Sequence, residues 1–356
     1  MFYVIFQKKL QEIYFFYFLI QYDKKTCLYI KEKNDRYSNN LPLIFSFMNT
    51  IDSQYLDLVK EILKAPLKDN RTWIGTHAIA CRSIRHDMSQ WFPLLTTKKV
   101  PMKIVAVELE WFIKWISDKK WYQERNCHIW DERCNPQKVP YGHDEETKKK
   151  MMEESDLGRI YGVQRRDRNG NIQQAKENLF NQAGFCMLNL KDTGQQIDQV
   201  KRVVETLKTN PFDRRMIVNA RNPSDLNQMA LPPCHYSWQV IVTLNHQWEK
   251  VLNLTWNQRS VDTMLGLPFN IASYALLLML LAKESNMIPG ILMGSLGDVH
   301  IYENHIEWAK EQMSRASKEL PKLELTNWKS IWDWQYTDFE LQGYDPHPTI
   351  KFDIAV

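Results

Sequence analysis

The sequence lacks three features that mark common classes of protein. Its six cysteines include no C-x-x-C pair, so neither a zinc site nor a disulfide framework is indicated, and reduced thiols in the cytoplasm are the simplest account. The net charge is only +4, with basic residues spread along the chain, whereas a nucleic-acid-binding protein concentrates them on one face. The longest apolar run in residues 1–47 is eight residues, far short of the roughly 20 that span a bilayer. We therefore expect no metal, no DNA partner and no membrane association.

The composition is that of a globular protein. Of the 356 residues, 44% are hydrophobic and 25% are charged, which is enough for a sizeable core. Apolar spacing and start signals predict helices at 53–64, 103–116, 197–207 and 268–286, strands at 76–85 and 236–243, and a polar loop at 136–154. The elements follow no βαβ regularity and no internal repeat, so the predicted fold class is α+β.

Residues 231–239, with the sequence LPPCHYSWQ, hold one cysteine in a stiff turn before a strand. Pro232 and Pro233 fix their own φ angles, and Pro232 keeps the residue before it out of the helical region. Cys234 therefore lies where a rigid loop enters a strand, which is a suitable mount for a nucleophile. Taken alone, a single cysteine is more often a small buried apolar residue. A protease-like pair with His235 is excluded, because neighbours on a strand point to opposite faces.

Further motifs change this interpretation of the cysteine. They are DRR (213–215), QRSVD (258–262), LGLPFNIASY (265–274), GDVHIY (297–302) and GYDPHPTIK (343–351). In sequence and in order, these motifs resemble the thymidylate synthase and deoxypyrimidine-monophosphate hydroxymethylase family over about residues 53–356. The resemblance implies a mixed sheet packed by helices, in one catalytic domain of residues 48–356 that dimerises through the sheet. Residues 1–47 are expected to be an N-terminal extension, either untranslated, with Met48 as the start, or disordered.

The resemblance also implies dUMP as the substrate. Guanidinium forks suit its phosphate, and Arg214 and Arg215 would reach that phosphate from the partner subunit of a homodimer. Asn270 would pair with the uracil, because an amide offers both donors and an acceptor, whereas the cytosine hydroxymethylases carry Asp there. The remaining substrate-binding residues that the resemblance implies are Arg71, Gln239, Ser260, His300 and Tyr302.

The covalent step that the resemblance implies is the addition of the Cys234 thiolate to C6 of the uracil. C5 then attacks the methylene of 5,10-methylenetetrahydrofolate. A thiolate at neutral pH needs a nearby cation, and Arg259 is the implied one. Glu108 would organise water for proton transfer. The residues implied for the folate pocket are Trp130, Asp262, Leu231 and Ala355.

Several departures from the family bear on the product. Arg133, Arg165 and Arg221 stand where the synthases carry tryptophan, Glu110 adds a carboxylate, and insertions of roughly 20 residues each follow Trp130 and Tyr161. Buried unpaired charge draws in water, and water would quench the methylene intermediate as a hydroxymethyl group. We therefore expect a deoxyuridylate hydroxymethyltransferase, as in bacteriophages that replace thymine, acting in the host cytoplasm.

Two alternatives remain open. One is a thymidylate synthase, in which a hydride from the folate reduces the methylene, and Trp130 favours it because that residue shields the intermediate. The other is an inactive nucleotide-binding or RNA-binding relative. The intact Cys234, Arg259, Asn270 and Glu108 argue against it.

Overall fold

The computed structural model describes residues 50–70, 74–142, 144–166 and 197–351. The chain divides into two units, 1–47 and 48–356, and every described residue belongs to the second. The predictions for Arg71, for Ala355 and for the segment 1–47 lie outside the described residues. The helices are α3 (Thr50–Ile62), α4 (Met102–Ile113), α5 (Lys120–Gln123), α6 (Glu145–Glu153), α7 (Tyr161–Arg166), α9 (Gln199–Thr209), α10 (Gly266–Glu284) and α11 (Ile306–Met313), with short 3-10 helices η1 (Met88–Gln90), η2 (Pro223–Gln228) and η3 (Glu303–His305).

Six strands form one mixed sheet, in the order β1-β2-β6-β5-β4-β3. Neighbouring strands are antiparallel except β5 and β6, which run parallel. The strands are β1 (Leu67–Lys68), β2 (Thr76–Asp87), β3 (Ile217–Asn219), β4 (His235–Leu244), β5 (Lys250–Asp262) and β6 (Ile288–Tyr302), and a separate antiparallel pair consists of β7 (Lys322–Leu325) and β8 (Phe339–Gln342). The predicted α+β class with a mixed sheet is confirmed.

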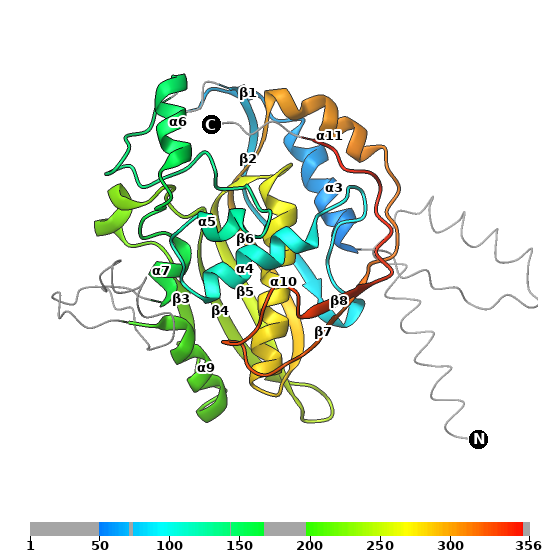
Figure 1. The fold of residues 1–356 in the computed structure, drawn as a ribbon. Coiled ribbons are helices and arrows are strands. Elements are labelled where there is room, and N and C mark those ends of the chain that lie inside the picture. The colour runs from blue at the N-terminus through cyan, green and yellow to red at the C-terminus, as the bar shows by residue number, and fades with distance from the viewer. Residues whose placement is uncertain (1–49, 71–73, 143, 167–196, 352–356) are drawn as a thin grey trace, which may run out of the picture. The chain divides into compact units, whose positions relative to one another are not determined.

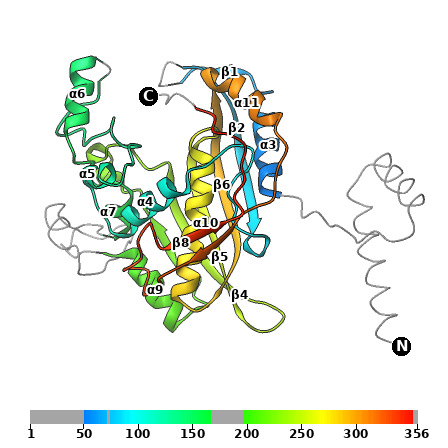
Figure 2. The same ribbon diagram turned by 45° about the vertical axis from the view of Figure 1, so that its right-hand side comes forward.

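Helix α10 is the centre of the core. It packs on β5 and β6, and α4 lies over it, while α3 packs on β2 (Figures 1 and 2). Asp262 Oδ1 accepts hydrogen bonds from the backbone N–H of Met264 and Leu265 just before the helix begins. Pro268 lies in the first turn, where a missing N–H costs nothing. This helix is long and apolar enough to cross a membrane, but 78% of its most apolar window is buried inside the protein, as expected of a core helix.

Three predicted elements differ from the structure. Helix α3 begins at Thr50, three residues before its predicted start at residue 53. The segment 136–154 is not all loop, because α6 forms within it. Asp144 caps α6 by accepting a hydrogen bond from Thr147 N at 2.9 Å, and Lys–Glu pairs along the helix support it. Helix α4 ends at Ile113, three residues earlier than predicted, because Trp115 takes a left-handed φ of 45°. Trp115 therefore lies beyond the end of the helix.

The second face of the large sheet carries no helix among the described elements. The register places Arg85, Met293, Thr255, Gln239 and Ile217 side by side across five strands. The apolar members of this face that are exposed are Ile217, Ile241 and Met293. We call this surface the open face of the sheet.

Candidate active site

Cys234 lies immediately before β4, as the sequence predicts. Its backbone N–H donates to the hydroxyl of Tyr161 at 2.9 Å. Arg259, on the neighbouring strand β5, donates from Nε to the Pro233 carbonyl at 2.9 Å and from Nη2 to the Pro232 carbonyl at 2.8 Å. These two bonds hold the guanidinium beside the thiol, with Nη2 at 3.8 Å from Sγ. The two prolines therefore position the cation as well as the cysteine.

The charge state of Cys234 depends on opposing effects. Burial raises the pKa of the thiol, and Asp262 acts in the same direction, while the charges of Arg259 and Arg133 and a hydrogen bond with Tyr161 lower it. Burial is the largest of these effects, so the pKa lies above its ordinary value. Arg259 thus lies where it was expected and favours the thiolate, but it does not outweigh burial in the unliganded chain.

Cys234 opens into a cavity of about 1000 Å³ at one end of the large sheet. The start of β4 and the ends of β5 and β6 meet there, because β5 and β6 run parallel. The residues predicted for the site that line this cavity are Leu231, Cys234, Arg259, Ser260, Asp262, His300 and Tyr302. Gly297 lets β6 pass close to Arg259, because a Cβ there would lie 2.8 Å from the Arg259 carbonyl oxygen.

One histidine and one tyrosine side chain from β6 face the cavity together. His300 and Tyr302 are two residues apart, so they share one face of the strand, and their ring centroids are 5.2 Å apart. His300 Nδ1 lies 2.7 Å from Asp298 Oδ1, and Lys68 Nζ pairs with the other Asp298 oxygen at 2.7 Å. Asp298 and Lys68 also line the cavity, although the sequence alone did not single them out.

Glu108 lies on α4 beside the indole of Trp130, whose Nε1 donates to Glu108 Oε1 at 3.3 Å. Burial raises the pKa of Glu108 to about 7, against the opposing effects of that hydrogen bond and of the charge of Arg165. Trp130 packs edge-on against Tyr161, at 6.2 Å between ring centroids. Because Tyr161 also bonds to Cys234, these contacts connect Glu108 to the thiol. A carboxyl group that titrates near neutral pH can both take and release a proton.

Asn270 is buried on α10, and its Oδ1 accepts a hydrogen bond from Gln258 Nε2 at 3.0 Å. Its side chain therefore packs against Gln258 and is not part of the cavity wall. Gln258 was quoted in the QRSVD motif but not assigned a role, although strand alternation places it on the same face as Ser260 and Asp262. The Asn270–Gln258 pair is the arrangement that sequence reasoning missed.

Gln239, Arg214 and Arg215 lie away from the cavity of their own chain. Gln239 is on the open face and donates to the Arg214 carbonyl at 2.9 Å. Arg214 and Arg215 are exposed, and Arg215 pairs with Asp213 at 2.7 Å. Their expected role at a partner's phosphate stays a prediction, as do the roles of Arg71 and Ala355.

The residues that favoured a hydroxymethyl product fall into two groups. Arg133 and Arg221 line the cavity. Glu110 does not, because it pairs with Lys114 and accepts a hydrogen bond from Tyr336 N at 2.9 Å. The expectation that Glu110 would hold water beside Glu108 is therefore wrong, since residues two apart on a helix point in different directions.

Arg165 is buried and also lies outside the cavity wall. Its Nη2 donates to the Tyr274 hydroxyl at 2.9 Å, and its guanidinium carbon lies 5.2 Å from the ring centre of Phe112 and 5.7 Å from that of Tyr161. Aromatic rings enclose this cation where water was expected, and cation–π contacts of this kind are favourable when desolvated. The argument that Arg165 would hydrate the cavity therefore fails.

No cluster of three or more His, Cys, Asp or Glu side chains that could hold a metal ion occurs within the described ranges of the chain. The chemistry that this site offers is that of a nucleophilic thiol, a neighbouring guanidinium and a carboxyl group of near-neutral pKa. Such a set is suited to covalent addition followed by proton transfer.

Comparison with known proteins agrees with this arrangement. The sequence profile of the thymidylate synthase family matches residues 53–356. The chain is 40% identical over 316 residues to a thymidylate synthase of Mycoplasma pneumoniae, with 85% of this chain and 99% of that protein covered. It is 39% identical over 306 residues to a bifunctional dihydrofolate reductase-thymidylate synthase of Paramecium tetraurelia, with 86% of this chain and 61% of that longer protein covered. By the extent of the profile match and by these identities, the chain belongs to the thymidylate synthase family.

Proposed function

We propose that this protein transfers a one-carbon unit from 5,10-methylenetetrahydrofolate to C5 of dUMP and reduces it, which yields dTMP and dihydrofolate. The observation that carries the proposal is the Cys234 thiol held beside Arg259 at the wall of a large cavity. This arrangement occurs in a chain 40% identical to a thymidylate synthase over nearly the whole of that protein.

The cavity wall supplies partners for the phosphate and the sugar of dUMP, and Asn270 behind it supplies one for the base. Arg259 and Ser260 would bind the phosphate, and His300 and Tyr302 would bond to the sugar hydroxyl. The Asn270 amide group would donate to the uracil from behind the wall, because its oxygen is already held by Gln258. Binding of the anionic nucleotide would bring its ring over Sγ, which is the attacking atom.

The reaction balances with the groups of the chain and of its two substrates. Sγ of Cys234 would bond to C6, and C5 would bond to the folate methylene as one of the two bonds between that methylene and folate nitrogen breaks. C5 would then lose its proton, and the second nitrogen–methylene bond would break as tetrahydrofolate departs, which leaves an exocyclic methylene on the base. Hydride from the folate reduces that methylene, and Cys234 is expelled. Glu108 is the group that would relay protons to and from the base, because a carboxyl group with a pKa of about 7 can take and release a proton at neutral pH.

Three observations favour reduction over hydration of the methylene. Trp130 is present and buried, at 7% exposure, and bonds to Glu108. Glu110 pairs with Lys114, and Arg165 donates to the Tyr274 hydroxyl, so both have partners away from the cavity. Arg133 and Arg221 remain as polar groups in the cavity wall, and they are the reason to test the hydroxymethyl product directly.

The active form that we propose is a homodimer joined through the open face of the sheet. That face exposes Ile217, Ile241 and Met293. A second hollow of about 630 Å³ lies on it, between Arg82, Tyr236 and Arg259. Arg259 lines both this hollow and the cavity, so Arg214 and Arg215 of a partner subunit could approach the phosphate through it.

The product assay tests the proposal. Incubation with dUMP and methylenetetrahydrofolate is expected to give dTMP by mass spectrometry and an equal amount of dihydrofolate by absorbance. A nucleotide heavier than dTMP by one oxygen, with no dihydrofolate, would identify a hydroxymethyltransferase instead. Binding of dUMP without any turnover would indicate an inactive relative. Mixing Cys234→Ser and Arg214→Ala chains should restore activity only if the active site is shared between subunits.

A further inference from the structure

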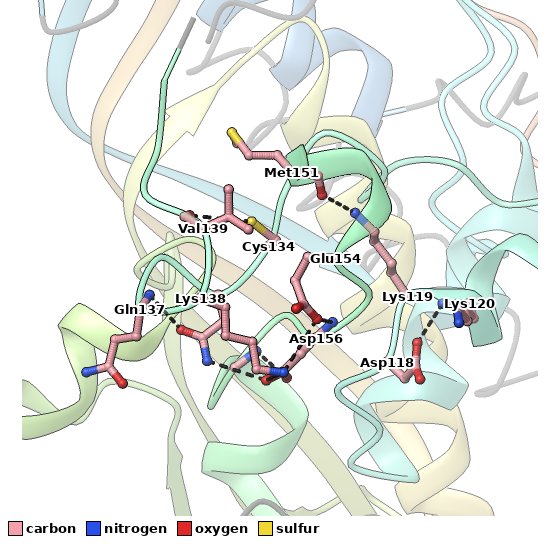
Figure 3. A network of polar contacts seen from close by, with 12 residues as sticks. Asp118, Lys119, Lys120, Cys134, Gln137, Lys138, Val139, Met151, Glu154 and Asp156 are labelled. Carbon is pink, nitrogen blue, oxygen red and sulfur yellow. Dashed lines mark hydrogen bonds and ion pairs between the residues drawn. The ribbon is translucent and has the colours of Figure 1, made fainter. Parts of the chain in front are cut away.

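Lys119 is a buried lysine at the start of α5, with 1% of its surface exposed. Its Nζ donates to three backbone carbonyls: Met151 at 2.6 Å, Asp131 at 2.8 Å and Arg133 at 3.1 Å. Figure 3 shows the bond to Met151 and the polar groups around it. Burial lowers the pKa of Lys119. No carboxylate pairs with this ammonium group within the described part of the chain. An ammonium group has three N–H donors, and the three carbonyls accept one hydrogen bond from each.

Two of these carbonyls belong to the turn that carries Trp130 into the site. Arg133 N donates to the Trp130 carbonyl at 3.0 Å and closes this turn. On one side of the turn, Trp130 bonds to Glu108. On the other side, Arg133 lines the cavity and lies over the ring of Tyr141, at 5.7 Å. The Lys119 ammonium group therefore holds the Trp130–Arg133 backbone, which contacts Glu108 at one end and the cavity at the other.

The third carbonyl belongs to α6, within the insertion that follows Trp130. The backbone N–H of Lys119 also donates to Ser155 O at 2.8 Å. The insertion is fastened a second time at its outer side, where Lys138 pairs with Asp156 at 3.0 Å and with Glu154 at 3.4 Å (Figure 3). The Lys119 bonds connect the insertion to the Trp130 turn, whereas the Lys138 pairs lie within the insertion, and this difference between the two fasteners can be tested.

We propose that Lys119 is a positioning residue, which holds the Trp130–Arg133 turn so that Trp130 meets Glu108 and Arg133 meets the second substrate. The inference rests on the proposed function. An aliphatic side chain of similar length would fill the space but remove the donor from three carbonyls, one in a buried contact and two in partly buried ones. The turn would then move to find other partners, and displacements of about 1 Å near reacting groups can cost about a hundredfold in rate.

The groups that face Glu108 determine what a displaced Trp130 would change. Besides Trp130, they are Arg165 and Tyr161 from α7, Tyr122 from α5, Tyr274 from α10, and Cys127. The Trp130 hydrogen bond lowers the pKa of Glu108. Loss of that bond should raise this pKa further, and the acid limb of C5 proton release should then move to higher pH.

The experiment compares Lys119→Met with two matched controls. Lys120→Met removes the exposed neighbouring lysine, and Lys138→Met removes the outer fastener of the same insertion. Each variant is assayed for tritium release from [5-³H]dUMP across pH, for KM of methylenetetrahydrofolate, and for hydrogen exchange of the backbone in residues 128–135. If Lys119→Met does not fold, Lys119→Gln takes its place, because it keeps two N–H donors.

For Lys119→Met we expect faster exchange in residues 128–135, a loss of about a hundredfold in kcat/KM for the folate, and an acid limb displaced upward. Both controls should match the wild type in all three measurements. A Lys119 variant that lowers only the melting temperature, with the exchange and the pH profile unchanged, would overturn the inference. A wild-type protein without turnover would instead overturn the proposed function, and the exchange measurement would still decide whether Lys119 holds the turn.

Discussion

Replacement of the Glu108 carboxyl group by an amide should raise stability at alkaline pH while it removes most of the activity. Glu108 is partly buried on α4, and burial raises its pKa from the usual 4.5 to about 7. The folded protein therefore keeps this proton over a range in which the unfolded chain has lost it. Glu108→Gln resembles the protonated acid in shape and can still accept the hydrogen bond from Trp130 Nε1.

The magnitude follows from the two pKa values. The stabilisation that the protonated carboxyl provides is fully present below pH 4.5 and is lost as the pH rises through about 7. At about 1.4 kcal/mol for each pH unit, an ionised Glu108 costs the folded state about 3 kcal/mol at pH 8.5. At pH 5 the same calculation gives a cost to the folded state of less than about 1 kcal/mol. Glu108→Gln should therefore gain most of its stability at the higher pH.

Urea unfolding at pH 5 and pH 8.5 measures this difference, and tritium release from [5-³H]dUMP measures proton transfer. We expect Glu108→Gln to release tritium about 10²- to 10⁴-fold more slowly than the wild type. Glu110→Gln is the matched control on the same helix: it loses the pair with Lys114, so it should gain no stability at pH 8.5. A change in unfolding free energy that is equal at both pH values would refute the reasoning, and so would wild-type tritium release.

Three further predictions concern the other parts of the site and the chain. Cys234→Ser should abolish turnover but leave dUMP binding within a few fold, because a hydroxyl forms no accessible anion at neutral pH; comparable rates in a turnover assay would remove Cys234 from the mechanism. Asn270→Asp should weaken the preference for dUMP over dCMP, measured as a ratio of kcat/KM, and an unchanged ratio would mean that the base is recognised elsewhere. Deletion of residues 1–47 should leave the melting temperature and turnover intact, because the family match begins at residue 53; a large fall in either would show that the extension supports the catalytic domain.

Local patterns were sufficient for much of the site. The Pro-Pro-Cys turn before a strand placed Cys234 correctly, because proline restricts the backbone whatever surrounds it. The resemblance implied Ser260, Asp262, His300 and Tyr302, and alternation along β5 and β6 brings them to the same cavity. The spacing that predicted a helix at 268–286 was also sufficient for α10, whose continuous apolar run is typical of a buried helix. The turn and the helix depend on covalent geometry and on the period of one element, whereas the four site residues depend on motifs.

Local patterns were insufficient to predict the structure and the partners of charged residues. The polar sequence of α6 was interpreted as loop, although its cap and its Lys–Glu pairs make it helical. Glu110 and Arg165 were expected to wet the cavity, yet each finds partners on elements distant in sequence, Tyr336 for one and Tyr274 for the other. Lys119 carried no signal at all, because its three acceptors are backbone carbonyls.

The sequence by itself therefore determined the family, the α+β fold and the nucleophile, since these depend on motifs and on backbone restrictions along the chain. Only the tertiary structure decided the electrostatics of the site. The pKa of about 7 for Glu108, the dominance of burial over Arg259 at Cys234, and the enclosure of Arg165 all depend on which groups meet across the fold. The free energy of a charge is set by its distance from other groups and by its contact with water, and neither quantity is encoded in the spacing of residues along the chain.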